Sequence, residues 1–305
     1  MTITPTSDSL TDVTGVAPTA PGQPGGPMPQ LTGSGLGRFV RRTSAVTALR
    51  LIVPPVILAA RWGLSWSETG SLFVANPFDA FGRVRSDFLA PDADRLFLGD
   101  ATWDHLLPSV WRALQGLALA IVLGVGAGIA LGRHRILMAL FQPLIHLGRS
   151  LPSPALIGVF FFLFGTGDSP KIFLIAFSVV WPILFNTIDG VTSIGATRMQ
   201  AAVIFKIGRW DRLVHIVLPG AAPKIFAGVR TAMSLSLIIM IISELQKSQN
   251  GLGHLLIQMQ RNFDYTGFWA VLVVLAILGV VMNIIFTIIE RRVPARHRGA
   301  TQQHD

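Results

Sequence analysis

Few residues of this chain have the type and spacing needed for catalytic or metal chemistry. No cysteine occurs, which excludes disulfides, thiolate metal ligands and cysteine nucleophiles. The seven histidines are scattered, and no two have metal-ligand spacing on one apolar segment. Neither a Gly-x-Ser-x-Gly elbow nor a Gly-x-x-x-x-Gly-Lys-Ser/Thr phosphate loop is present. The sequence therefore predicts no catalytic residue, no metal site and no cofactor on this chain.

One carboxylate, Glu244, stands at the end of a strongly apolar run. An ionisable group within a bilayer costs about 2.5–3.5 kcal/mol on insertion scales, so chance placement is disfavoured. We predict that Glu244 lines or gates a solute path. The alternative is a carboxylate in water at the outer interface, because Gln246 and Lys247 follow it.

A second group of polar candidates lies in apolar segments that contain proline. Arg149 precedes Pro152, and a helix broken at membrane depth is tolerated where it faces protein or water. Arg149 could attract an anionic solute or pair with a buried carboxylate or carbonyls. Ser150, Pro152 and Asn186 are further candidates for the lining of the path, although polar groups on spans more commonly hydrogen-bond between helices.

The composition requires lipid as the solvent for much of the chain. Of the 305 residues, 51% are hydrophobic and 13% are charged, and the mean hydropathy is +0.56. The net charge of +9 does not indicate nucleic acid, because only 4 of the 25 basic residues are lysines and most arginines flank apolar runs. We therefore predict an all-α, polytopic membrane protein without a nucleic-acid partner.

Six segments approach the length of about 20 apolar residues that a membrane span requires. The second carries Gly116, Gly124, Gly128 and Gly132, a spacing that places small residues on one helix face for close packing. The predicted spans are Leu49–Trp66, Ala113–Leu131, Met138–Phe164, Ile172–Ile188, Ile225–Ile242 and Phe268–Ile289.

Basic residues in short loops predict which face is cytoplasmic. Arginines and lysines cluster at 38–42, 133–135, 198–224 and 291–298, and six spans put all four clusters on one side, with both termini inside. We predict a disordered cytoplasmic tail at 1–44, a first transmembrane helix with an external segment at 45–107, a core at 108–293 and a cytoplasmic tail at 294–305. If the first segment does not cross, the N-terminus lies outside and every later loop keeps its side.

The loop at 190–224 is amphipathic rather than lipid-soluble. Ala201 and Ala202 begin a helical stretch, Gly208 provides a turn, and an apolar face leads to Leu218-Pro219. The pattern predicts a helix, a turn and a second helix on the cytoplasmic surface.

This loop resembles the signature of the inner-membrane permeases of binding-protein-dependent ABC importers. That signature reads Glu-Ala-Ala, three residues, Gly, and a spacer that ends in Leu-Pro. Counted back from Leu218-Pro219, it falls on Gln200, Ala201, Ala202 and Lys206, so Gln replaces Glu and Lys replaces Gly. Pro223, Gly228 and the Arg209-Trp210 pair also fit.

Further elements, spread over residues 103–293, resemble the sulfonate, taurine, nitrate and bicarbonate branch of this family. The matching residues are Ser109-Val-Trp111-Arg112, Arg149-Ser-Leu-Pro152-Ser-Pro-Ala155, Phe164-Gly165-Thr-Gly167, Lys171-Ile172-Phe173, Pro182-Ile-Leu-Phe-Asn186-Thr, Glu244 and Gly251-Leu252-Gly253.

The resemblance implies a type I importer permease fold and the role of each partner. It implies a second copy of this chain, cytoplasmic ATPase subunits that hold ATP and Mg²⁺, and an external solute-binding protein, all at the bacterial inner membrane. It also implies that the loop is a coupling helix seated in the ATPase. We expect its contact surface at Gln200, Ala201, Ala202, Phe205, Lys206 and Gly208, anchored by breaks at Pro219 and Pro223.

The departure at Lys206 affects the turn of this helix. A glycine permits a tight turn that other residues disfavour, so we expect Gly208 to supply the turn in a shifted position. The permease could also have lost coupling.

Two other functions stay open at this point. An ion-driven transporter or channel needs no ATPase, but the amphipathic loop and the scarcity of intramembrane acids disfavour it. An intramembrane enzyme needs paired catalytic residues, which the sequence lacks. The candidate solutes are sulfonates, taurine, nitrate, bicarbonate, aromatic acids and pyrimidine vitamin precursors.

Overall fold

The described part of the chain is almost entirely helical. A computed structural model describes residues 76–89, 98–246 and 248–292, with Val56 and Gly63, all within one compact unit. Within these ranges the only β pairing is an isolated bridge between Leu89 and Leu98. The all-α prediction is confirmed. The predicted span Leu49–Trp66, apart from Val56 and Gly63, and the tails predicted at 1–44 and 294–305 lie outside the described residues.

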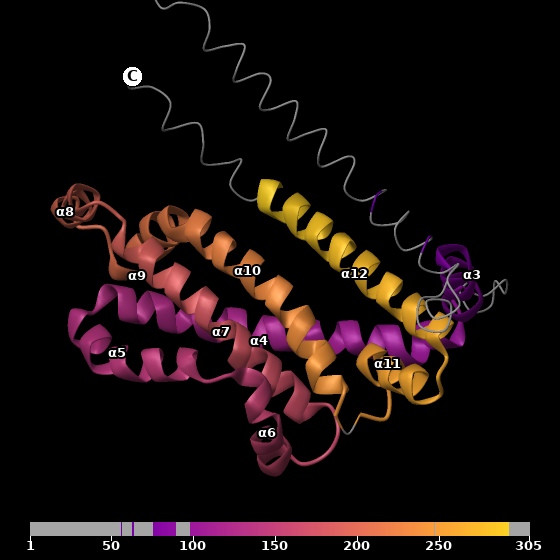
Figure 1. The fold of residues 1–305 in the computed structure, drawn as a ribbon. Coiled ribbons are helices and arrows are strands. Elements are labelled where there is room, and N and C mark those ends of the chain that lie inside the picture. Colours follow the sequence, from indigo (N-terminus) through magenta and orange to yellow (C-terminus); the bar gives the residue numbers. More distant parts are fainter. Residues whose placement is uncertain (1–55, 57–62, 64–75, 90–97, 247, 293–305) are drawn as a thin grey trace, which may run out of the picture. The chain divides into compact units, whose positions relative to one another are not determined.

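In the described ranges, four helical runs are long and apolar enough to cross a membrane. The number of candidate spans rises to five if a bent pair of helices counts as one span. The last five predicted spans coincide with these helices, and the observed helices extend beyond the predicted ends. The runs are Thr102–Arg133, Ser169–Thr192, Arg209–Glu244 and Tyr265–Glu290, and the bent pair is Arg135–Ser150 with Ser153–Phe164. In Figure 1 they carry the labels α4 (Leu107–Arg133), α7 (Ser169–Thr192), α10 (Leu218–Glu244), α12 (Tyr265–Arg292), α5 (Arg135–Ser150) and α6 (Ile157–Phe164).

Helix α7 packs closely between α4 and α10. A Cβ on Gly116 of α4 would lie 2.6 Å from Ile175, and one on Gly128 would lie 2.6 Å from Thr187. On the other side of α7, a Cβ on Gly228 of α10 would lie 2.8 Å from the Asn186 side chain. The glycine stripe predicted on α4 therefore permits close backbone contact, and α4 and α7 run in the same direction.

The bend between α5 and α6 follows from two prolines. Proline disfavours helical geometry in the residue before it, and Leu151, before Pro152, is extended with ψ 124°. Ser153–Leu156 then form a 3₁₀ turn (η3) with Pro154 in its first turn, and α6 leaves at 86° to α5. The break predicted at Pro152 and Pro154 is confirmed.

Two prolines near the start of long helices produce wide turns rather than breaks. A π-helical turn, Thr102–Leu106 (η2), comes just before Leu107-Pro108, and another, Leu213–Val217 (η4), comes just before Leu218-Pro219. Proline has no N–H and its ring crowds the carbonyl four residues back, so a widened turn keeps the helix continuous. The predicted break at Pro219 is therefore wrong. Pro223 also lies inside α10.

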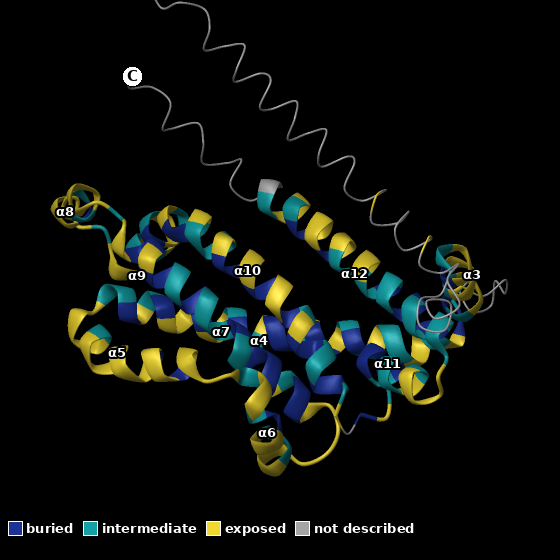
Figure 2. Cartoon of the chain, viewed as in Figure 1, coloured by how far each residue is buried: buried dark blue, intermediate teal, exposed yellow. Residues whose placement is uncertain are grey.

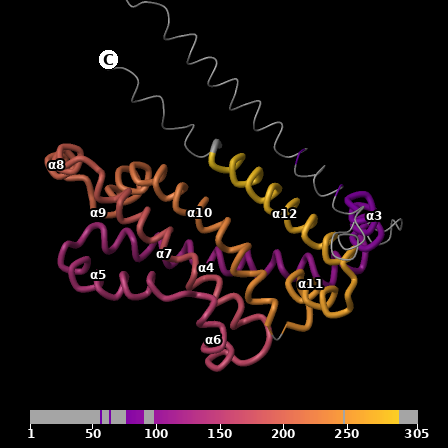
Figure 3. Tube along the Cα trace, viewed as in Figure 1, coloured from indigo at the N-terminus to yellow at the C-terminus, as the bar shows by residue number. Residues whose placement is uncertain are grey.

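Four short helices complete the described chain, as the tube in Figure 3 shows. The helix α8 (Ala196–Ile204) and the single turn α9 (Arg209–Arg212) link α7 to α10. The two others are α3 (Pro77–Phe88) and α11 (Leu252–Arg261), which the sequence did not predict. Both are too short and too polar to register as spans.

We expect Gly128→Ala to destabilise the protein by about 1–3 kcal/mol, because the added methyl overpacks the α4–α7 contact at Thr187. Gly126 is a matched control two residues away, where a Cβ meets nothing within 4 Å. Gly126→Ala should be neutral or stabilise the helix by about 0.5–1 kcal/mol. Thermal unfolding of the detergent-solubilised variants measures both, and equal effects would contradict the close packing.

Candidate functional site

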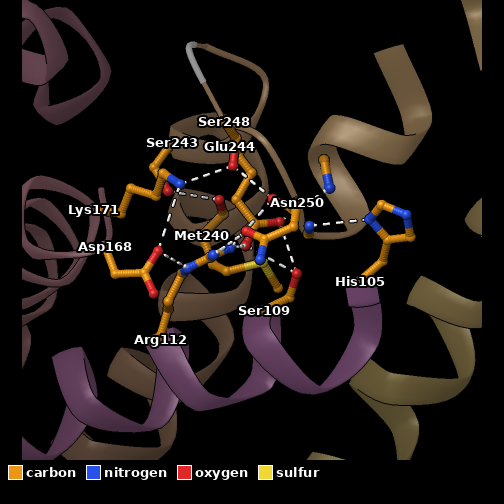
Figure 4. A network of polar contacts seen from close by, with 12 residues as sticks. His105, Ser109, Arg112, Asp168, Lys171, Met240, Ser243, Glu244, Ser248 and Asn250 are labelled. Carbon is orange, nitrogen blue, oxygen red and sulfur yellow. Dashed lines mark hydrogen bonds and ion pairs between the residues drawn. The ribbon is translucent and has the colours of Figure 1, made fainter. Parts of the chain in front are cut away.

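A buried ion pair joins the start of α4 to the end of α10. The Arg112 Nη1 atom lies 2.6 Å from Glu244 Oε1. Arg112 is 1% exposed and Glu244 is 0% exposed. Figure 4 shows this pair at the centre of a network of polar side chains. A buried charge is expensive unless it is paired and hydrogen-bonded, so the other partners decide whether the pair is stable.

Both oxygens of the Glu244 carboxylate accept hydrogen bonds. Ser109 Oγ lies 2.9 Å from Oε1 and 2.7 Å from Oε2 and donates to the carboxylate. The Gly253 N–H donates to Oε2 over 3.0 Å, and the Leu252 N–H donates to Ser109 Oγ over 2.8 Å. The first turn of α11 is thereby held against α4 and α10.

The Arg112 guanidinium extends the network to α7. Its Nε donates to Asp168 Oδ1 over 2.7 Å, and its Nη2 donates to Asn250 Oδ1. Lys171 of α7 lies 3.8 Å from the same Asp168 oxygen and donates to Ser248 Oγ over 2.8 Å. Charges and donors from four segments therefore compensate one another in one buried cluster.

Two glycines make room for the carboxylate. Gly251 has φ +109°, which non-glycine residues rarely adopt, and a Cβ there would collide with the Glu244 carboxyl group. A Cβ on Gly253 would lie 2.7 Å from Glu244 Cβ and 2.6 Å from the Ile241 carbonyl oxygen. The Gly-Leu-Gly pattern therefore supplies the backbone part of this site.

The network is suited to holding helices together. Its donors and acceptors pair with each other, and no group of three His, Cys, Asp or Glu residues that could hold a metal occurs among the described residues. Glu244 does not lie in water, so the alternative drawn from Gln246 and Lys247 is wrong. Its predicted role in the solute path stays a prediction.

Sequence reasoning noted Ser109, Arg112 and the two glycines as parts of a resemblance but did not assemble them. The available signal was charge: Arg112 and Glu244 are opposite charges at the ends of two spans, and such residues usually pair within the protein. The sequence pattern does not predict that these two spans are neighbours at these ends.

The other predicted path residues do not gather around Glu244. Arg149 lies 5.3 Å from the Phe185 ring centroid, a cation–π contact at the end of α5. Ser150 Oγ donates to Leu147 O over 2.8 Å, and Asn186 Nδ2 donates to Pro182 O over 2.8 Å, each within its own helix. Pro152 is exposed at the bend. Their role in transport stays a prediction.

The segment between α7 and α10 forms a second candidate surface. It begins where α7 ends, and the 24 residues of α7 span about 36 Å, so it is remote from the Arg112–Glu244 network. Between residues 203 and 210 of this segment, four large apolar side chains are exposed, and Phe205 is 78% exposed. They are Val203, Ile204, Phe205 and Trp210. We call these four residues the apolar tip.

The structure revises the contact surface predicted on this segment. Ala202 is 2% exposed, so its methyl packs against its own chain and is not available to a partner. Gln200, Lys206, Gly208 and Leu218 are exposed, whereas Ala201 and Pro219 are half-buried. The exposed side chains that sequence reasoning missed are Val203, Ile204 and Trp210, although their hydrophobicity on an amphipathic loop was a usable signal.

Lys206 itself makes the turn that was expected at Gly208. Its φ is +52°, whereas Gly208 has φ −56°. The Lys206 N–H donates to Val203 O over 2.9 Å, and the Ile207 N–H donates to Ala202 O over 3.0 Å. These two bonds form a Schellman motif, which ends a helix with a left-handed residue. The lysine therefore occupies the conformation that the signature glycine favours.

Comparison with known proteins now adds a family. The family described as "Binding-protein-dependent transport system inner membrane component" matches residues 120–294, more than half of the chain. The chain belongs to this family. It is a multi-pass inner-membrane permease of the ABC importer type.

Three curated relatives locate the permease within the family. It is 31% identical to the bicarbonate transport system permease protein CmpB of Synechococcus elongatus over 60% of this chain and 66% of that protein, slightly under two thirds. It is 29% identical to the taurine transport system permease protein TauC of Escherichia coli, over 66% and 73%. It is 33% identical to the putative aliphatic sulfonates transport permease protein SsuC of Escherichia coli, over 62% and 72%. The permease is therefore a member of the sulfonate, taurine and bicarbonate branch.

A solved structure supports the fold. A chain of the MetNI methionine ABC transporter in an inward-facing conformation superimposes with a TM-score of 0.56 at 17% identity, covering 62% of the permease and 94% of that chain. At this identity the match bears on the fold alone, and it confirms the type I importer permease architecture.

We expect Glu244→Ala to destabilise the permease by about 3–5 kcal/mol, because it leaves Arg112 buried without its partner. The double variant Arg112→Met with Glu244→Ala should lose less than the sum of the single variants. Asp189→Ala is the control, since the Lys224–Asp189 pair is exposed and should contribute about 0–1 kcal/mol. Thermal unfolding measures all of these, and additive losses would contradict the coupling.

We expect Lys206→Gly to stabilise the permease by about 0.5–1 kcal/mol, since it removes a side chain from a left-handed conformation. Lys206→Ala is the matched control, because it removes the charge but keeps the Cβ, and it should give no gain. Hydrogen exchange at the Ile207 amide reports the local effect. Equal protection in both variants would show that the gain does not come from φ.

Proposed function

We propose that this permease passes a small solute across the inner membrane while a separate ATPase drives it through the apolar tip. The observation that carries the proposal is the exposure of Val203, Ile204, Phe205 and Trp210 on a short segment between two membrane helices. Large apolar side chains that cluster on an exposed surface mark a site for a partner. Lys206 and Arg209 add positive charge around them.

The apolar tip is attached firmly enough to act as a lever. At its root, a Cβ on Gly190 of α7 would lie 3.0 Å from the Ala221 side chain of α10. Lys224 Nζ lies 2.7 Å from Asp189 Oδ2 between the same helices. Arg212 Nη2 donates to Ile207 O over 3.1 Å, which ties α9 to the turn after α8. A push on the tip would therefore move α7 and α10 together.

Helix α10 can carry such a displacement across the membrane. The helical run from Arg209 to Glu244 has 36 residues, and the π turn before Pro219 keeps it continuous. Its last residue is Glu244, which is bonded to α4 and α11. We propose that the network transmits movement at the tip to the opposite ends of α4 and α7.

The remaining partners follow from the family and from charge. We propose a homodimer of this chain, two ATPase subunits that bind ATP and Mg²⁺, and an external solute-binding protein. The basic residues at 133–135 and 198–224 favour a cytoplasmic position for the apolar tip, with both termini inside. Relatives named for bicarbonate, taurine and aliphatic sulfonates make a small anion the favoured solute class.

We expect Phe205→Asp to weaken co-purification of the ATPase by about tenfold or more, because an ionised side chain replaces an exposed apolar anchor. In liposomes, the ATP hydrolysis that the solute-loaded binding protein stimulates should fall by a similar factor. Phe81→Asp is the control, since Phe81 is an exposed phenylalanine on α3, remote in sequence from the tip.

The same liposomes distinguish the ion-driven alternative. Solute uptake that needs ATP and the ATPase supports the proposal. Uptake that follows a proton or sodium gradient with no ATPase bound would contradict the proposed ATP-driven function. Full coupling in Phe205→Asp would instead remove the tip as the point of contact.

A further inference from the structure

The turn that leads into α11 is held by side chains of other helices. Its successive N–H groups, at residues 251, 252 and 253, donate to His105 Nδ1 over 3.2 Å, to Ser109 Oγ over 2.8 Å and to Glu244 Oε2 over 3.0 Å. The first N–H groups of a helix have no partner within the helix, so these acceptors complete the start of α11. The Arg112–Glu244 network accounts for two of the acceptors and leaves His105 (Figure 4) to be explained.

The hydrogen bond to Gly251 fixes the protonation state of His105. An N–H group donates to Nδ1 only if that nitrogen carries no proton, so the ring is neutral here and its proton lies on Nε2. A proton on Nδ1 would turn the acceptor into a donor and set it against the Gly251 N–H. Histidine is the side chain whose ordinary pKa, about 6.5, lies between pH 5 and 8. Mild acidification therefore acts on this bond.

Two ionisable groups act on His105 electrostatically. The His254 ring of α11 stacks on it, with ring centroids 6.2 Å apart and 22° between the planes, so two protonated rings would repel each other. Asp104 has the opposite charge and lies in the same π turn, η2, but it is exposed and screened by water. A proton on His105 is therefore opposed most directly by a proton on His254.

Charged groups of the other helices around this turn are already paired. On α4 and α10, Arg112 lies 2.6 Å from Glu244. On α3, Arg83 lies 3.0 Å from Asp87, and it also lies 3.5 Å from Asp264, just before α12. These pairs hold their charges in place, so His105 and His254 are the groups that change charge near neutral pH.

Water can reach both histidines. Each ring is half-buried, and Figure 2 shows intermediate and exposed positions on α11 beside buried ones. The backbone between the rings and the network is a glycine with φ +109°, and a Cβ on this Gly251 would collide with the Glu244 carboxyl group. Gly251 therefore contacts a titratable ring through its N–H and the buried carboxylate through its Cα.

We propose that His105 is a pH-sensitive latch on the turn at residues 251–253. Proton uptake from water at Nδ1 breaks the bond to Gly251, and the new charge repels His254 once that ring is protonated. The start of α11 then leaves α4, and the packing of Gly251 on Glu244 is loosened. Acid outside the cell thereby lowers transport. The latch rests on the proposed function, which places this turn outside and makes the network part of the drive.

The pH effect has a defined direction because the two states of the turn bind different numbers of protons. The latched state has no proton on Nδ1, whereas the released ring takes one up with the ordinary pKa of about 6.5. The released state binds more protons, so the latch weakens as the pH falls. From about pH 7.5 to about pH 5.5, the ratio of released to latched turns should rise about tenfold.

Hydrogen exchange of the full-length permease in detergent measures this ratio. After correction for the intrinsic exchange rates, a peptide that covers residues 251–254 should exchange about tenfold faster at the lower pH. In His105→Gln the change should be less than about twofold, because the amide oxygen still accepts a hydrogen bond but does not titrate. The matched control is His146→Gln, at an exposed histidine of α5, which should keep the tenfold change.

Three exchange results overturn the latch. The first is exchange independent of pH in the unaltered permease, a result that needs no variant to fold. The second is an equal pH response in His105→Gln. The third is loss of the response in His254→Gln, which would assign the switch to the other ring, whereas a response that persists there supports His105.

ATP-driven uptake into liposomes tests the consequence for transport. Uptake at an external pH of about 5.5 should fall at least about threefold relative to about pH 7.5, and His105→Gln should remove most of that fall. An equal fall in both proteins would overturn the effect on transport. Hydrogen exchange needs no ATPase, so a complete lack of ATP-driven uptake would count against the proposed function while the latch is still decided by exchange.

Discussion

The structure at one end of the permease depends on the buried ion pair of Arg112 and Glu244. Two charges removed from water are stable only if the remaining donors and acceptors are also paired. Ser109, Asp168, Asn250 and the backbone of the Gly251–Gly253 turn supply those partners. Because these groups come from α4, from the loop before α7 and from the loop after α10, compensating the charges brings these segments together. Glycine at 251 and 253 follows from the same need, since a Cβ at either position would occupy the space of Glu244.

Helix α10 connects this end of the molecule to the apolar tip. Prolines are expected to interrupt a helix, but the wide π turn at Leu213–Val217 keeps this helix continuous although Pro219 has no N–H to donate. A helix that stays continuous through this region can have one end in the exposed tip and the other in the network. Close contact with α7, through Gly190 and Gly228, adds a second rigid element.

Much of the fold follows from sequence pattern because lipid imposes strong constraints on length and composition. Apolar runs near 20 residues, glycine spacing on α4 and the prolines near residue 152 predicted the later spans, the close α4–α7 contact and the α5–α6 bend. Short helices such as α3 and α11 escaped prediction since their packing is tertiary and their patterns are weak. Lys206 escaped for another reason: a left-handed lysine opposes intrinsic preference, and the two Schellman hydrogen bonds hold it there.

The sequence by itself determined the membrane class, the family resemblance, the position of the amphipathic segment and the ionisable residues to be explained. Only the tertiary structure decided their partners. Glu244 belongs with Arg112, 132 residues away in the chain, and Arg230 lies against Glu290 on α12. Pairings of this kind depend on which helices are neighbours and at what depth, and that follows from close packing of whole helix faces. A local pattern specifies the face of a helix, but not the helix that covers it.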